Sequence, residues 1–285
     1  MNIGNIVSGG GGVASALRRD LTASAYWQDC VREYTFQPIY YTCGRPLAIE
    51  LLTRVVHPTQ PERGLSPEHY FAHIPLSLRL QVLLEQIRLV YRWRQFLGQR
   101  DLFVSINVDG QVLHALQEEE EAAALIEQLP FLRFEVLEHV QGSAPIHELA
   151  EIHRLWLDDF GSGLANFSSL IDVRYEFVKL DRAVFALLCQ TPEGTELFMA
   201  LVAMMRQYSR GVIVEGVENA QAWHLVQRSD ACAAQGYYLS RPITIRTATA
   251  VTAPFRRLRC PCALRIELWA TMILDSFDRG EVATP

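Results

Sequence analysis

The chain has 285 residues, of which 49% are hydrophobic and 20% are charged, a composition that excludes disordered and fibrous proteins. Its 32 acidic and 26 basic residues give a formal net charge of −6, which argues against a nucleic-acid polymer as partner, because such surfaces normally carry excess positive charge. No apolar run reaches the roughly 18 residues of a membrane helix, and no secretion signal opens the chain. We therefore expect a cytoplasmic protein that does not bind a membrane and whose six cysteines are free thiols.

The sequence divides into three regions by composition. Residues 1–25 contain a run of four glycines and are predicted to be a flexible N-terminal segment. The composition changes again after Pro254, so we set residues 255–285 apart as a C-terminal tail of unknown role, either a helix that docks on the domain or a partner surface. The domain itself is expected to span residues 26–254.

Within the domain, short apolar segments alternate with helix-like ones. Apolar runs on both sides of residues 42–45 predict a hairpin, and a long helix is expected from Ser66 to Leu97, with Ser66 as its cap and Pro67 at its first position. The remaining expected strands are 102–108, 131–137, 155–160, 176–181, 211–217 and 235–240, and the expected helices are 118–128, 183–189, 195–208 and 220–227. This alternation predicts an α/β fold, and its spacing favours a (β/α)8-like, TIM-type barrel.

Charged and amide side chains lie inside or at the ends of these apolar strands. Removing such groups from water costs several kcal/mol for each unpaired ion, so their repeated occurrence requires a common explanation. If they converge on the C-terminal mouth of a barrel, divalent cations supply it, and carboxylate and amide oxygens suit Mg²⁺ or Mn²⁺ better than zinc. The residues concerned are Glu50, Asn107, Glu135, Asp158, Asp159, Lys179 and Glu215.

Each of these residues also has a simpler interpretation. Asp158 and Asp159 precede Phe-Gly-Ser-Gly and could cap a turn. Lys179 could pair with Asp181, and Asn107 could be a turn residue. The metal hypothesis therefore rests on all of the positions together rather than on any one of them.

The same residues lie in a series of motifs that resembles the EAL-type cyclic di-GMP phosphodiesterases, and the resemblance covers about three quarters of the chain. The motifs occur in order: Gln37-Pro38-Ile39, Glu50-Leu51-Leu52-Thr53-Arg54, Asn107, Glu135-Val136-Leu137-Glu138, Asp158-Asp159-Phe160-Gly161-Ser162-Gly163, Lys179-Leu180-Asp181-Arg182, Glu215-Gly216-Val217-Glu218, and Gln235-Gly236-Tyr237 with Ser240-Arg241-Pro242. Two positions depart from the family pattern, Leu51 for alanine and Leu137 for threonine. The chain looks most like the short standalone members of the family.

The resemblance implies a barrel whose first strand is antiparallel, and metal-dependent hydrolysis of cyclic di-GMP to linear 5′-pGpG in the control of motility and biofilms. It implies two cations, with Glu50, Asn107, Glu135 and Asp158 at the first and Asp158, Asp159 and Glu215 at the second. Two metal ions can hold a phosphodiester and lower the pKa of a water molecule. The implied catalytic residues are Lys179, Glu215 and Asp159, and the general base is left open between Lys179 and Glu215.

Further roles follow only from the resemblance. Gln37, Arg54 and Gln235 would contact the substrate or its water, and Glu138 and Glu218 would brace the loop that follows Asp159. A homodimer is a hypothesis by analogy with the family. The alternative function is a catalytically inactive EAL-like module that binds cyclic di-GMP or a protein; a glycosidase with paired carboxylates would not require Asn107, Lys179 and Arg54 together.

Overall fold

The computed structural model describes residues 26–136, 154–163, 170–171 and 173–244. Its described part forms two compact units. One consists of residues up to Tyr34 together with Thr53–Arg79, and the other of Thr35–Leu52 and the chain from Leu80 onward. Strands β1 (Val31–Tyr41) and β2 (Pro46–His57) each contribute residues to both units. Among the described residues, no helix has both the length and the apolar character required to cross a bilayer.

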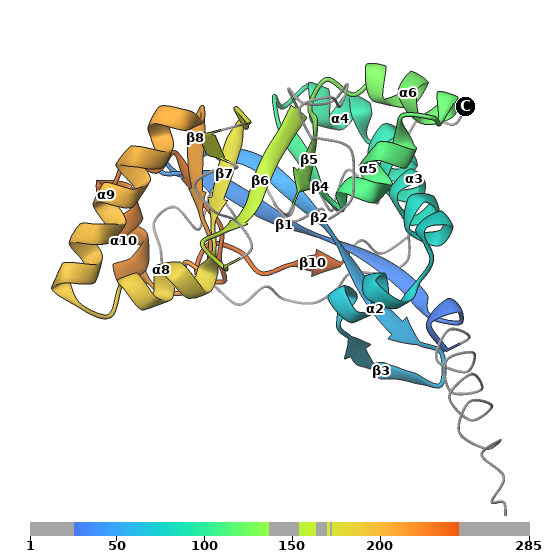
Figure 1. Cartoon of the computed structure of the whole chain (residues 1–285), viewed down its shortest axis with the longest axis horizontal. Coiled ribbons are helices and arrows are strands. Elements are labelled where there is room, and N and C mark those ends of the chain that lie inside the picture. Colours follow the sequence, from blue (N-terminus) through green and yellow to red (C-terminus); the bar gives the residue numbers. More distant parts are fainter. Residues whose placement is uncertain (1–25, 137–153, 164–169, 172, 245–285) are drawn as a thin grey trace, which may run out of the picture. The chain divides into compact units, whose positions relative to one another are not determined.

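The second unit contains a closed barrel of eight strands (Figure 1). Their order around the barrel is β1, β9 (Ala233–Ala234), β8 (Gly211–Val214), β7 (Phe177–Leu180), β6 (Leu155–Phe160), β5 (Leu132–Val136), β4 (Phe103–Val108) and β2, and β2 pairs with β1 to close the ring. Neighbours from β2 round to β9 are parallel, whereas β1 runs antiparallel to β9. The predicted barrel with an antiparallel first strand is therefore confirmed.

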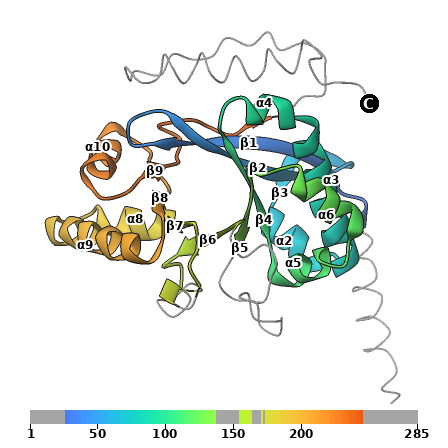
Figure 2. The same cartoon turned by 90° about the horizontal axis from the view of Figure 1, so that it is seen from above.

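Helices flank this barrel in two groups. One group lies beside β4 and β5 and the other beside β7 and β8 in both views (Figures 1 and 2). The first group comprises α3 (Leu76–Arg92), α5 (Gly110–Leu116) and α6 (Glu120–Glu127), and α4 (Arg94–Gly98) follows α3; the second comprises α8 (Arg182–Leu188), α9 (Pro192–Tyr208) and α10 (Ala220–Arg228). The caps explain several helix starts, because Asp109, Asp181, Thr191 and Asn219 each accept backbone N–H bonds through their side chains.

The barrel interior changes from apolar to polar along the strands. Side chains of alternate residues point inward, so residue i and residue i+2 of one strand lie one above the other inside the barrel. An apolar residue of the interior core is followed two positions later by a polar one in Ala48/Glu50, Trp156/Asp158, Phe177/Lys179, Ile213/Glu215 and Ala233/Gln235. On the antiparallel strand β1 the order is reversed, and Gln37 precedes Ile39. A layer of polar side chains therefore covers an apolar floor at the C-terminal end of the parallel strands.

The first unit has a small core of its own. It contains β3 (Gln60–Leu65), which pairs with β2 in antiparallel fashion, and α2 (Pro67–His73). Cys30, Val55, Tyr70 and Ile74 are buried together there.

The structure corrects three expectations about the elements. The predicted helix from Ser66 to Leu97 is divided into α2, α3 and α4. Pro75 accounts for the break between α2 and α3, because it has no N–H to donate and forces Ile74 into an extended conformation, and α3 and α4 are separated at Trp93. Residues 235–240 are a turn rather than a strand, with the N–H groups of Leu239 and Ser240 bonded to the Gly236 carbonyl. The last strand of the described residues is instead β10 (Ile243–Thr244), and the short elements β3 and α5 were not predicted.

Candidate metal centre

Lys179 lies at the centre of the polar layer. Its side chain is 1% exposed, and its ammonium is within ion-pair distance of four carboxylates. Nζ lies 2.7 Å from Glu135, 2.8 Å from Glu215, 3.1 Å from Asp158 and 3.5 Å from Glu50. These acids come from four different strands or strand ends, so the barrel brings together residues that are far apart in sequence. The alternative pairing of Lys179 with Asp181 is wrong, because Asp181 caps α8.

Glu50 is fixed by two amide side chains. The Nδ2 group of Asn107 donates to Glu50 Oε1 at 2.8 Å, and the Nε2 group of Gln235 donates to Oε2 at 2.7 Å. Asn107 is therefore part of the site and not a turn residue; Asp109 is the residue that caps α5. Because both amides donate an N–H group to Glu50, their carbonyl oxygens are left for other partners, and Gln235 Oε1 is buried without a hydrogen bond.

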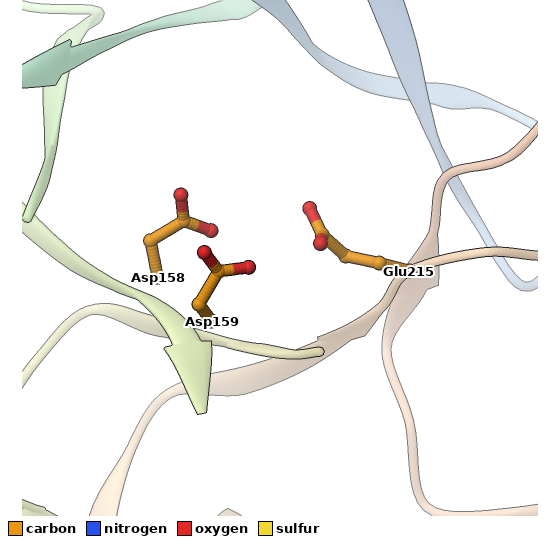
Figure 3. A group of neighbouring side chains, drawn as sticks. All are labelled: Asp158, Asp159 and Glu215. Atoms are coloured by element: carbon orange, nitrogen blue, oxygen red, sulfur yellow. The ribbon is translucent and has the colours of Figure 1, made fainter. Parts of the chain in front are cut away.

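A local distortion of β6 brings two consecutive aspartates to the same side of the strand. Consecutive residues of a regular strand point to opposite faces. Here the register with β7 shifts between Leu157 and Phe160, and Asp159 has a φ of 52°, in the left-handed region that non-glycine residues rarely adopt. Asp158 and Asp159 consequently direct their carboxylates toward Glu215, which approaches from the end of β8 (Figure 3).

Burial and mutual repulsion shift the pKa values of these acids. Burial raises the pKa of Glu215 to about 8, the charges of Asp158 and Glu50 adding to the effect against Lys179. Burial and the neighbouring Asp158 raise the pKa of Asp159 to about 6. The pKa of Glu135 is likewise raised well above its ordinary value by burial and by Glu50. The cluster therefore holds more negative charge than its surroundings offset.

The pKa values of two other groups in the cluster shift in the direction that favours the charged form. Burial alone would lower the pKa of Lys179, but the surrounding carboxylates raise it well above its ordinary value. Burial would raise the pKa of Glu50, yet Lys179 and the two amide donors hold it below its ordinary value. The structure thus favours a charged ammonium at Lys179.

The residues of the cluster fit a divalent cation. Oxygen atoms of Asp158, Asp159 and Glu215 lie within 4.8 Å of one another. Glu135 Oε1 and Asp158 Oδ1 are buried without a hydrogen bond, although the latter lies 3.1 Å from the ammonium. Buried acceptors without partners are costly, and carboxylate oxygens are the ligands that Mg²⁺ and Mn²⁺ prefer.

The remaining predicted site residues lie in different surroundings. Gln37 donates to the Ser240 carbonyl at 3.0 Å. Arg54 belongs to the first unit, where its guanidinium pairs with Glu33 of β1 at 2.5 Å. Glu218 is exposed after β8, and Glu138 lies outside the described residues.

Sequence reasoning gave no role to Arg182, whose side chain packs against the loop that carries Glu215. In the sequence, the glycine next to Glu215 indicated that the backbone there comes close to another residue. Gly216 has a φ of 73°, and a Cβ there would lie 2.1 Å from Arg182 Cγ.

The fold and the site together define a TIM-type barrel with a cluster of acids at its mouth that could hold a metal ion. Residues 19–242 match the EAL domain family, and the chain belongs to that family. It is 48% identical over 231 residues to the cyclic di-GMP phosphodiesterase PdeH of Escherichia coli K12, a match that covers 80% of this chain and 91% of PdeH.

Solved EAL structures share the fold. The EAL-like domain protein YdiV superposes with a TM-score of 0.65 at 19% identity, covering 74% of this chain and 92% of that one. The EAL enzyme Bd1971, in its form bound to cAMP and cyclic di-GMP, gives a TM-score of 0.63 at 19% identity and covers 82% of this chain and 68% of its own.

Proposed function

We propose that this protein is a metal-dependent phosphodiesterase that hydrolyses cyclic di-GMP to linear 5′-pGpG. The observation that supports this most directly is the convergence of Glu50, Glu135, Asp158 and Glu215 around Lys179, with Asn107 bonded to Glu50. The similarity to PdeH, a cyclic di-GMP phosphodiesterase, extends over nearly all of that relative. Hydrolysis would lower the cellular level of the dinucleotide, and we infer control of motility or biofilm formation from the family.

We infer that Glu50, Asn107, Glu135 and Asp158 hold one cation and that Asp158, Asp159 and Glu215 hold a second. Such cations, Mg²⁺ or Mn²⁺, offset the phosphodiester charge and lower the pKa of a nearby water molecule. In the reaction, the oxygen of that water would attack phosphorus in line, and the bond from phosphorus to the 3′ oxygen would break.

Lys179 and Glu215 would have different roles in the reaction. A lysine kept protonated by four carboxylates serves to stabilise the charge that develops on the phosphate oxygens. Because Lys179 stays protonated, we assign the other candidate, Glu215, as the general base that would accept the proton of the water. Asp159 would assist as a ligand beside it.

The other assignments concern contacts with the substrate and the loop after Asp159. Arg54 would bind a substrate phosphate after its guanidinium is released from Glu33, and bidentate geometry suits it to that task. Gln37 and Gln235 would contact the substrate or its water, and Glu138 and Glu218 would brace the loop after Asp159.

The decisive experiment is incubation of the purified protein with cyclic di-GMP and Mn²⁺, followed by chromatography. We expect linear pGpG from the wild type and none after EDTA treatment or in the Glu50→Ala variant. The matched control is Glu121→Ala, an exposed carboxylate on α6 whose loss should leave turnover unchanged. Binding of cyclic di-GMP without turnover in Mn²⁺ would identify the chain as an inactive binding module instead.

Homodimerisation is a separate proposal. Leu187 on α8 and Leu197 on α9 are large apolar side chains that remain 64% and 59% exposed in the single chain. A second copy of the chain could cover them. Light scattering at the concentration of the assay should report a dimer, and a monomer that is fully active would exclude it.

A further inference from the structure

The start of α8 contacts both segments that carry Asp158, Asp159 and Glu215: the end of β6 and the loop after β8. The backbone N–H of Asp181 donates to the Phe160 carbonyl, directly after Asp158 and Asp159, at 3.1 Å. The N–H of Glu215 donates to the Leu180 carbonyl, also at 3.1 Å. Two adjacent residues, Leu180 and Asp181, thus join both acid-bearing segments through the main chain.

The first turn of α8 also contacts both loops with its side chains. Gly161 adopts a φ of 95°, and a Cβ built there would lie 3.0 Å from Val184 Cγ2. Gly216 adopts a φ of 73°, and its Cβ would lie 2.1 Å from Arg182 Cγ. A glycine from each segment therefore lies against one side chain of the same helical turn, and both the positive φ values and the close contacts favour glycine at these positions.

The geometry of this turn is fixed from within the helix. The side chain of Asp181 accepts the N–H groups of Ala183 and Val184, both at 3.0 Å. The cap orients the turn that carries Arg182 and Val184, so these two side chains are held at a set separation.

We propose that Arg182 and Val184 are positioning residues that set the distance between the Asp158–Asp159 pair and Glu215. The methyl groups of Val184 locate the first loop, and the aliphatic stem of Arg182 locates the second. This inference rests on the proposed function, because it assumes that these acids share a cation. The exposed guanidinium of Arg182 has no part in it.

The first test measures Mn²⁺ binding without substrate by electron paramagnetic resonance, together with kcat and the thermal midpoint. Arg182→Ala and Val184→Ala should each weaken Mn²⁺ binding about tenfold, since residues that orient metal ligands typically contribute 10- to 100-fold in affinity. Both variants should lower kcat while the thermal midpoint of the EDTA-treated protein stays close to wild type. Arg182→Met keeps the stem and loses the charge, so it should retain wild-type Mn²⁺ affinity.

The second test is a double-variant cycle. Gly216→Ala should weaken Mn²⁺ binding, because the new methyl group collides with Arg182 and the backbone at φ 73° disfavours alanine. Adding Arg182→Ala removes Cγ, which lies at 2.1 Å, and leaves only the Cβ of residue 182 at 3.0 Å, so the double variant should bind Mn²⁺ more tightly than Gly216→Ala alone.

Three results would overturn the inference: additive effects in the cycle, equal losses in Arg182→Met and Arg182→Ala, or unchanged Mn²⁺ affinity in both alanine variants. A wild type that binds Mn²⁺ but does not cleave cyclic di-GMP would defeat the proposed function alone. The affinity measurements would still decide whether the two residues position the acids.

Discussion

The electrostatics of single residues explains why this cluster could hold cations. Lys179 is surrounded by four carboxylates, and Asp159 adds a further acid beside Asp158. One ammonium cannot offset this charge, and the protein responds with raised pKa values at Glu135, Asp159 and Glu215. Protons and divalent cations therefore compete for the same oxygen atoms.

Lys179→Met should show how far the ammonium supports the fold. Removing one partner of a buried ion pair leaves the other charges uncompensated, at a typical cost of about 3–5 kcal/mol. We expect a lower thermal midpoint in EDTA, partial recovery of the midpoint in Mn²⁺, and loss of turnover in Mn²⁺. Calorimetry with and without Mn²⁺ measures the first two effects.

Lys179→Arg is the matched control for charge, because it keeps the positive charge while changing its shape. It should be more stable in EDTA than Lys179→Met. If the two variants melt at the same temperature, the counter-charge role of Lys179 is wrong.

Stability of the metal-free protein should fall as the pH rises. The pKa of Glu215 is about 8 in the folded protein, above its ordinary value of 4.5, so the folded state binds more protons than the unfolded state between these pH values. The contribution of this residue to stability is present below pH 4.5 and is lost as the pH rises through about 8. Denaturant titrations in EDTA across this range measure the slope.

Glu215→Gln should flatten that slope, since glutamine does not titrate. Metal binding should show the opposite trend, with Mn²⁺ affinity rising with pH and protons released on binding. Calorimetry in buffers of different ionisation enthalpy counts those protons. Wild type and Glu215→Gln with identical pH profiles would contradict the raised pKa.

At the scale of elements, the opposite end of the barrel interior carries a different kind of polar group. Glu176 precedes β7 and accepts hydrogen bonds from Arg133 of β5, from Trp156 of β6 at 3.1 Å, and from Arg210 before β8 at 2.9 Å. Arg133 also donates to the Pro130 and Leu132 carbonyls. Here charges are paired and hydrogen bonds are made, so this network joins neighbouring strands without requiring a metal.

Glu176→Ala should therefore destabilise the barrel without affecting its mouth. The change leaves the buried Arg133 without its carboxylate, and losses in such cases are about 3 kcal/mol. We expect a lower thermal midpoint and unchanged Mn²⁺ affinity. Glu121→Ala removes an exposed bidentate partner of Arg88 and should shift the midpoint far less. Equal shifts of the thermal midpoint in the two variants would show that the buried network contributes no more to stability than an exposed ion pair.

At the scale of the whole molecule, the sequence predicted the barrel and the acids at its mouth because both follow from short-range patterns. Each apolar strand that ends in Asp, Glu or Asn can be recognised in the sequence by itself, and the family motifs occur in the same order as these strands. The bulge that turns Asp158 and Asp159 to one side was not predictable, because it depends on the pairing of β6 with β7. Nor was the packing of Arg182 on Gly216, which joins the first residue of α8 to the loop after β8.

The contacts that connect the first barrel strand to the end of the described chain were also not predictable from the sequence. The sequence places Gln37 in the opening motif, and the resemblance assigns it to the substrate. The structure shows its buried Nε2 donating at 3.0 Å to the carbonyl of Ser240, 203 positions away. This bond and the pairing of Phe36 with Ile243 connect the beginning of the barrel with the last described strand.

Gln37→Ala should distinguish a structural role of Gln37, through its bond to the Ser240 carbonyl, from a role in binding the substrate. Loss of the side chain leaves the buried Ser240 carbonyl without this donor, and an unsatisfied buried group costs about 1–3 kcal/mol. We expect a lower thermal midpoint, and Gln37→Glu, which cannot donate when ionised, should behave similarly. Gln81→Ala on the exposed face of α3 is the control and should leave the midpoint unchanged. An unchanged midpoint for Gln37→Ala with a raised KM for cyclic di-GMP would instead assign Gln37 to the substrate and remove it from the closure of the barrel.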